Sequence, residues 1–275
     1  MMGLITLETV INGLKAIPTE KYSQPNELAR LLFQSKTEYL LRDKLDLYFI
    51  DNFEAQGLLS IREWKNWEPW GLQLEHTIGY LRTTGREITV KELQKEWKNI
   101  KNELPEELQD FTWYKKGTAG VDLALFREYT DVDRENGEKR PFQLESVIEF
   151  KCEVLHQLNP QLLNNANYLT KDLERMKKFQ MATDCSYYQI LCLVDFPNGV
   201  KPKYYELNNH YKANAENVRG YSIPNMTNKL RDTFLGSYDV YYLSPKETAP
   251  IGVYLDSQIE LHYWIISPFS LNQSN

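Results

Sequence analysis

The sequence predicts an α/β fold with a mixed central sheet flanked by helices. Two stretches, residues 120–126 and 147–154, alternate apolar and polar side chains with a period of two, as strands do. An amphipathic helix is expected from Leu169 to Gln180, since its apolar side chains share one face. The following run, Tyr187 to Val194, is almost continuously apolar, which is typical of a strand buried on both faces. Together these stretches indicate one layered α/β core.

The length of the chain suits one domain rather than two. Its 275 residues are enough to bury a sizeable core. We expect a single domain over residues 1–275, with a core at about 25–196, a helical insertion at about 66–113 and a β-containing C-terminal extension at about 200–275. With 42% apolar and 25% charged residues, the composition is that of a globular protein.

Charge and apolar patterning restrict the class of protein. The formal net charge of −6 argues against indiscriminate binding to polyanions, which depends on many lysine and arginine contacts. No apolar run approaches the length of a membrane span, and the first residues lack a signal-peptide pattern. We therefore expect a cytoplasmic protein with no membrane partner. The three cysteines have no CxxC spacing and are interpreted as buried free thiols: Cys152, Cys185 and Cys192.

A predicted hairpin brings charged side chains of two strands together. In the first strand, Asp122 points away from its apolar neighbours, which are Val121, Leu123 and Leu125. In the second strand, alternation buries one set of side chains and puts three charged ones on the other face: Ile148, Phe150, Cys152 and Val154 against Glu149, Lys151 and Glu153. The polar connection from Arg127 to Pro141 contains Asn136-Gly137, which suits a hairpin turn. The two charged faces are therefore expected to meet.

A helical pattern extends from Pro25 to about Phe49, with one break near Ser35. At about 100° per residue, Glu38 falls on the apolar stripe of this pattern, with Leu31, Leu41, Leu45 and Phe49. A buried carboxylate needs a partner, because an unpaired charge there is costly. One candidate is the helix itself, since Ser35 to Glu38 has the spacing of a capping box.

The remaining elements are short. Leu59 to Trp64 alternates briefly and is expected to be the first strand of the sheet. In the insertion, a helix is expected from Thr89 to about Glu103, opened by a capping box of Thr89 and Glu92 and closed before Pro105. In the final third, strands are expected from Tyr238 to Leu243 and from Ile259 to Ile266, and the second is expected at a sheet edge. We expect no catalytic constellation in this part of the chain.

The hairpin and its neighbours resemble a known family, the PD-(D/E)xK nuclease superfamily, which has the restriction-endonuclease-like fold. The resemblance is carried by Asp122 on one strand and by Glu149-Phe150-Lys151 on the next. It covers about Glu38 to Val194, where helix, three strands, helix and strand follow the αβββαβ order of the family core. Val121 replaces the proline of the family motif, and the spacing from Asp122 to Glu149 is stretched.

The resemblance implies a metal-dependent DNA endonuclease, in a restriction or defence role. It implies that Asp122, Glu149, Lys151 and Glu38 are catalytic, and that the three carboxylates hold Mg²⁺ or Mn²⁺. Such an oxygen-rich site suits these ions and not zinc. Lys151 would orient the attacking water or neutralise developing charge. DNA is the expected partner, and a homodimer would let each protomer cut one strand. The alternative is a catalytically silent module that keeps the fold for nucleic-acid binding or complex assembly.

Simpler interpretations of the same residues stay open. The hairpin charges could form a solvated salt-bridge ladder, and Glu38 could serve only as a cap. Three tryptophans, Trp64, Trp67 and Trp70, could stack with Lys65 on nucleic acid or pack the insertion onto its host. The basic face of the helix that follows the hairpin could contact phosphates or face solvent: Lys171, Arg175 and Lys178.

Overall fold

The computed structural model has an α/β fold with one mixed, open sheet of seven strands. It describes residues 4–19, 26–34, 37–64, 77–109, 121–129, 135, 142–154, 172, 185–207, 223–234, 238–248 and 251–268. The strands are β1 (Leu58–Trp64), β2 (Val121–Glu128), β3 (Phe142–Val154), β4 (Ser186–Asp195), β5 (Tyr238–Leu243), β6 (Gly252–Tyr254) and β7 (Ser257–Pro268). The α-helices are α1 (Leu7–Ala16), α2 (Glu27–Gln34), α3 (Thr37–Phe53), α5 (Val90–Ile100), α6 (Glu106–Gln109) and α10 (Ile223–Phe234). Short 3₁₀ segments are η1 (Ile17–Thr19), η2 (Glu54–Gln56), η3 (Lys101–Glu103) and η6 (Pro202–Leu207).

The strand order across the sheet is β1-β2-β3-β4-β7-β5, and β6 pairs with β7 outside this path. β1, β2 and β3 form an antiparallel meander, whereas β3 and β4 are parallel. β7 is antiparallel to both of its neighbours, β4 and β5. A parallel pair cannot be joined by a tight turn, so the chain must cross over between β3 and β4.

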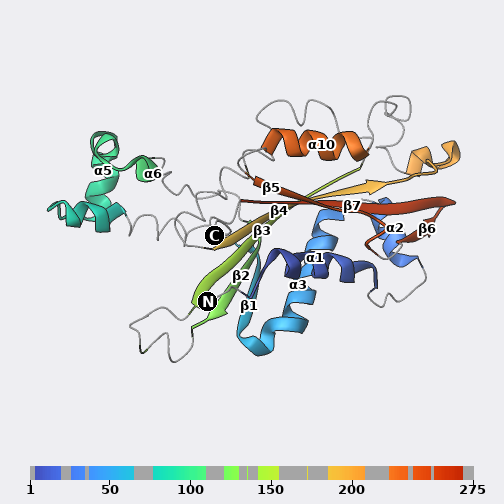
Figure 1. The fold of residues 1–275 in the computed structure, drawn as a ribbon, viewed down its shortest axis with the longest axis horizontal. Coiled ribbons are helices and arrows are strands. Elements are labelled where there is room, and N and C mark those ends of the chain that lie inside the picture. The colour runs from blue at the N-terminus through green and yellow to red at the C-terminus, as the bar shows by residue number, and fades with distance from the viewer. Residues whose placement is uncertain are drawn as a thin grey trace, which may run out of the picture.

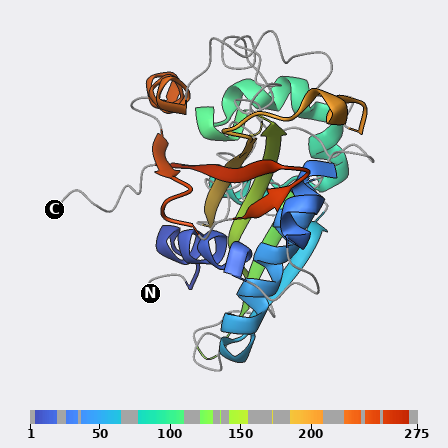
Figure 2. The ribbon, with the colours of Figure 1, turned by 90° about the vertical axis from the view of Figure 1, so that its right-hand side faces the viewer.

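Helices cover both faces of the sheet. One apolar cluster joins α1, α2 and α3 to one face, and a second joins α10 to the other. Figure 1 and Figure 2 both place α1 and α10 on opposite sides of β7. Within the described segments, no helix is both long and apolar enough to cross a membrane.

β4 confirms the prediction of a strand buried on both faces. Ile190, Cys192 and Val194 face the α1–α3 cluster, while Leu191 and Leu193 face the α10 cluster. All five side chains are inaccessible to solvent. β4 therefore forms the centre of the sheet, with β3 on one side and β7 on the other.

The predicted hairpin is present as β2 and β3, which are longer than expected. β2 ends at Glu128, so it takes Arg127 and Glu128 from the predicted connection, and β3 begins at Phe142, before the predicted strand start at Val147. Asn136-Gly137 lies outside the described residues. Leu123 and Leu125 face the α1–α3 cluster as predicted, but Val121 packs in the α10 cluster. Val121 lies beyond the last β2–β3 pair, Leu123 with Ile148, where pairing with β3 no longer fixes its direction.

The prediction that the last strand lies at a sheet edge is wrong. β7 runs between β4 and β5, so β5 and not β7 is the last strand on that side of the main sheet order. Leu261, Tyr263 and Ile265 face one cluster, while Trp264 and Ile266 face the other. The polar start of this strand suggested a half-exposed edge, but the run Trp264-Ile265-Ile266 is apolar on both faces because both faces are covered.

The helices outside the sheet follow the predicted boundaries closely. The pattern from Pro25 to Phe49 divides into α2 and α3, with Ser35 outside the described residues. The capping box of α5 is confirmed: the Thr89 hydroxyl accepts from the Glu92 N–H at 3.3 Å, and the Glu92 carboxylate accepts from the Thr89 N–H at 2.9 Å. α5 and α6 lie apart from the sheet in Figure 1, around a separate apolar cluster of Leu81, Ile88, Leu93, Ile100 and Leu104.

Candidate active site

The candidate site lies where, among the described residues, the pairing of β2 with β3 stops and β3 extends further along its pairing with β4. The β2–β3 ladder stops at Leu123 and Ile148, but β3 stays paired with β4 as far as Val154 and Val194. The edge of β3 that faced β2 therefore presents backbone N–H groups beyond Ile148. Since buried backbone donors need acceptors, these N–H groups need partners other than the described residues of β2.

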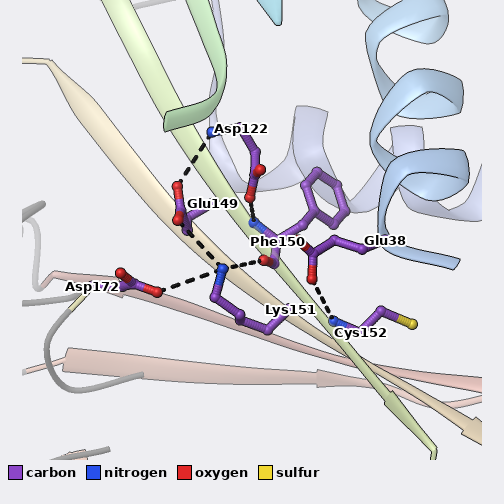
Figure 3. A network of polar contacts seen from close by, with 7 residues as sticks. All are labelled: Glu38, Asp122, Glu149, Phe150, Lys151, Cys152 and Asp172. Atoms are coloured by element: carbon purple, nitrogen blue, oxygen red, sulfur yellow. Dashed lines mark hydrogen bonds and ion pairs between the residues drawn. The ribbon is translucent and has the colours of Figure 1, made fainter. Parts of the chain in front are cut away.

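Two carboxylates from different elements supply these acceptors (Figure 3). The Phe150 N–H donates to Asp122 Oδ2 at 2.7 Å, and the Cys152 N–H donates to Glu38 Oε2 at 3.3 Å. A third carboxylate closes the other side, because Glu149 Oε2 accepts from the Asp122 N–H at 3.3 Å. The three predicted metal ligands thus gather along one short stretch of β3.

Lys151 lies among these carboxylates. Its Nζ donates to the Phe150 carbonyl at 2.9 Å and lies 3.4 Å from Glu149 Oε1 and 3.6 Å from Asp172 Oδ2 (Figure 3). Burial by itself would lower the pKa of Lys151, but Glu149, Glu38, Asp122 and Asp172 together raise it above its usual value. Lys151 is therefore an ammonium ion at neutral pH, held against the strand that carries it.

α3 places Glu38 beside the end of β3. Glu38 is in the first turn of α3, and Leu41, Leu45 and Phe49 below it are fully buried in the α1–α3 cluster. This packing fixes the start of α3 beside the end of β3, 114 residues away in sequence. The hydrogen bond to Cys152 gives Glu38 a partner outside its own helix, while the capping alternative involves Ser35, which is outside the described residues.

Asp172 is a member of the site that the sequence analysis missed. It is helical and half-buried, in the segment between β3 and β4. The sequence predicts a helix from Leu169 to Gln180. With about 100° of rotation per residue, Asp172 would lie on the same side of this helix as Leu169, Met176 and Phe179. The signal that located Glu38, a carboxylate inside an apolar stripe, was therefore present for Asp172 as well.

The distances between the carboxylates bear on metal binding. Glu38, Asp122 and Glu149 offer only oxygen donors, as Mg²⁺ and Mn²⁺ prefer. They do not form a group whose ligand atoms all lie within 4.8 Å of one another; among the described residues, only Asp195, Glu260 and His262 do. The carboxylates would have to approach one another to share an ion.

Several predicted contact residues cannot be placed. Lys65, Trp67 and Trp70, and the basic row Lys171, Arg175 and Lys178, lie outside the described residues, and the side chain of Trp64 is not described. The three cysteines are free thiols, with Cys185 and Cys192 buried and Cys152 half-buried. In the final third, where no catalytic constellation was expected, Glu260 and His262 lie with Asp195 in a group whose ligand atoms are all within 4.8 Å of one another.

Comparisons with protein-family models, with curated proteins and with solved structures found no match to this chain.

Proposed function

We propose that this protein is a metal-dependent endonuclease that hydrolyses DNA phosphodiester bonds. The observation that carries the proposal is the meeting of four carboxylates and Lys151 at the point where β3 leaves β2. These side chains come from α3, β2, β3 and the segment between β3 and β4. A purely structural salt bridge needs one carboxylate for one ammonium, whereas this arrangement surrounds a single ammonium with four.

We also propose that the core is restriction-endonuclease-like. The order α3, β1, β2, β3, a helical residue at Asp172, and β4 is compatible with αβββαβ. The antiparallel meander followed by a parallel strand is compatible with it too. A restriction or defence role is the setting that the resemblance of the motif suggests.

Glu38, Asp122 and Glu149 would hold the Mg²⁺ or Mn²⁺ ion. Such an ion, when bound, polarises a phosphoryl oxygen and lowers the pKa of a water molecule beside it. Asp122 and Glu38 each already accept a backbone N–H of β3, so their carboxylates have a fixed orientation before any ion arrives. This preorganisation lowers the cost of assembling the site.

Lys151 would act as a positive charge rather than as a base. Its raised pKa keeps the ammonium protonated, so it cannot readily accept a proton from water. Its hydrogen bond to the Phe150 carbonyl holds Nζ on the same side of β3 as Glu149. There it would lie beside the scissile phosphate and stabilise the negative charge that grows in the transition state.

Cleavage of plasmid and linear DNA by the full chain tests the proposal. We expect cutting with Mg²⁺ or Mn²⁺ and none with Ca²⁺, and loss of both cutting and metal affinity in Asp122→Asn and Glu149→Gln. Glu103→Gln is the matched control, because Glu103 is exposed and pairs with Arg86 far from the hairpin. DNA left intact by the folded parent with all three ions would contradict the proposal.

The second candidate is a silent module that binds nucleic acid or a partner without cutting. It is favoured by the structural use of Asp122 and Glu38, whose carboxylates complete the hydrogen bonding of β3. On this account, Asp122→Asn and Glu149→Gln lower stability, and the parent shows no Mg²⁺ or Mn²⁺ affinity that depends on them. Isothermal titration of the parent and both variants with Mn²⁺ separates the two functions.

A further inference from the structure

A second group of potential ligands lies where β4 ends against β7. Asp195 is the last residue of β4, and it is directly opposite Glu260 in the β4–β7 ladder. His262 follows two residues later on β7, on the same face as Glu260. The ligand atoms of the three side chains all lie within 4.8 Å of one another.

The facing pair of acids needs an explanation. Like charges directly opposite each other in a ladder destabilise the pair of strands. Burial raises the pKa of Asp195 above its usual value, so the protein environment already disfavours its charge. Among the residues that the structure describes, no lysine or arginine forms an ion pair with either carboxylate. A cation between the two acids would remove the repulsion.

His262 is aimed into this group. The side chain is 7% exposed, and its Nε2 makes no hydrogen bond. Nε2 lies 3.9 Å from Asp195 Oδ2 and 3.8 Å from Glu260 Oε2, which is too long for direct hydrogen bonds. Burial lowers the pKa of His262 to about 4, so the ring is neutral at pH 7 and one nitrogen carries a lone pair.

The contacts around the group hold the three ligand atoms in position. Asp195 Oδ1 accepts from the Phe196 N–H at 2.7 Å, and Glu260 Oε1 accepts from the Gln258 amide at 2.9 Å, so Oδ2 and Oε2 are the oxygens that face Nε2. On the other side of the ring, His262 Nδ1 and the Tyr242 hydroxyl are 2.7 Å apart. With Nδ1–H donating to Tyr242, the lone pair is on Nε2, which is the arrangement of a metal-binding histidine.

We propose that Asp195, Glu260 and His262 form a binding site for one divalent transition-metal ion, and that Zn²⁺ fits it best. One imidazole nitrogen and two carboxylates are ligands that Zn²⁺ accepts, whereas Mg²⁺ prefers oxygen alone. Tetrahedral Zn²⁺ with ordinary bond lengths separates its ligands by roughly 3.4 Å. A shift of about half an ångström by each partly exposed carboxylate would therefore bring its oxygen to that separation from Nε2. The ion would fasten the end of β4 to β7.

Zinc titration of the full chain, first dialysed against a chelator, tests the site. The calorimeter should record one Zn²⁺ per chain in the parent, and affinity should fall at least about tenfold in Asp195→Asn, Glu260→Gln and His262→Gln. Tyr242→Phe, which removes only the hydroxyl that orients the ring, should weaken binding by about 10- to 100-fold. Asp256→Asn, an exposed acid paired with Lys201, is the matched control and should bind as the parent does.

Thermal unfolding supplies a readout that does not depend on binding alone. Without metal, Asp195→Asn should melt at a higher temperature than the parent, because the substitution removes the repulsion between the facing charges. With Zn²⁺ in excess, the parent should melt at a higher temperature than Asp195→Asn, because only the parent binds the ion tightly. Circular dichroism establishes whether each variant folds. If His262→Gln does not fold, Asp195→Asn still tests the site, because the side chain of Asp195 is partly exposed and its substitution disturbs the core less. Absence of zinc binding by the parent, or zinc affinity that is equal in all variants, would overturn the site.

Binding elsewhere has a distinct signature. Co²⁺ bound at this group should show no thiolate charge-transfer band, whereas binding to Cys152 or Cys192 would show one and would overturn the assignment. The inference does not rest on the proposed nuclease activity. Zinc binding that survives in Glu149→Gln separates the zinc site from the nuclease site, because Glu149 belongs only to the site at the start of β2.

Discussion

Asp172 is the residue whose contribution to the candidate active site can best be separated from that of its neighbours. It approaches Lys151 Nζ at 3.6 Å from the segment between β3 and β4. Its substitution leaves in place the hydrogen bonds from Phe150 to Asp122 and from Cys152 to Glu38. For the proposed nuclease we therefore assign Asp172 a positioning role: it would fix the ammonium rather than touch the phosphate.

Asp172→Asn should lower the rate of DNA cleavage by about tenfold and leave Mn²⁺ affinity unchanged, because the lysine loses one of its four carboxylates while the metal ligands stay. Single-turnover cleavage and Mn²⁺ titration of the same preparation measure both quantities. Asp256→Asn serves as control, since it also removes a carboxylate paired with a lysine. A fall in Mn²⁺ affinity equal to that of Glu149→Gln would make Asp172 a ligand instead.

The sequence locates single residues only where a pattern makes them conspicuous. Glu38 and Asp172 both interrupt apolar stripes, and Asp122, Glu149 and Lys151 alternate with apolar side chains. His262 also alternates with apolar residues, but its importance depends on Asp195, which is on another strand. That pairing follows from the antiparallel register of β4 and β7, which the sequence does not contain.

Elements of the chain form where local signals and tertiary packing agree. α5 is the clearest case, since the capping box at Thr89 is followed by an apolar face of Leu93, Trp97 and Ile100. β7 is the opposite case: its local pattern predicted a strand but not its place between β4 and β5. Period and composition reveal what kind of element a stretch forms; the order of strands depends on which faces other elements cover.

Thr89→Ala should destabilise α5 by about 1 kcal/mol, because the hydroxyl satisfies the Glu92 N–H at the helix start. Hydrogen exchange of the α5 amides measures this locally. Thr83→Ala is a suitable control, since the Thr83 hydroxyl only donates to the Tyr80 carbonyl on an exposed surface. Equal exchange in α5 of Thr89→Ala and the parent would show that the cap adds nothing.

The same cap should weaken in acid. Hydrogen bonds from the Thr89 side chain and backbone hold the pKa of Glu92 below its usual value. The carboxylate therefore contributes stability that is present above the unfolded-state pKa and is lost as the pH falls through the folded-state pKa. Exchange in α5 should accelerate over that acidic range in the parent and change less in Glu92→Gln, after correction for intrinsic exchange.

At the scale of the whole molecule, the sheet holds two separate groups of charged residues. One lies where β2 and β3 part, and the other lies where β4 ends against β7. The α/β class was predictable because the hairpin alternates with a period of two, the flanking helices have apolar stripes, and the buried strand is an almost continuously apolar run. Other features depend on contacts between residues far apart in sequence. They are the packing of the insertion, the position of β7 inside the sheet and the approach of α3 to β3.

Cutting both strands of a duplex generally requires two sites, so we propose that the protein acts as a homodimer on DNA. Light scattering of the chain, alone and with a short duplex, should give the mass of two chains on the duplex. Glu149→Gln provides a form that binds without cutting during the measurement. A monomer in both conditions, together with single-strand nicks in the plasmid assay, would replace the dimer by a nicking enzyme.

The most direct test of the account is the single-turnover rate of DNA cleavage by the Lys151→Ala chain in Mg²⁺. Lys151 is the residue on which catalysis and a structural salt bridge differ most, since the catalytic role needs its charge only in the transition state. We predict that the variant folds, binds metal and binds DNA as the parent does, yet cleaves about a hundredfold more slowly or worse. Lys201→Ala, which removes an exposed lysine paired with Asp256, should cleave at the parental rate. Cleavage by Lys151→Ala at the rate of the parent would contradict the account.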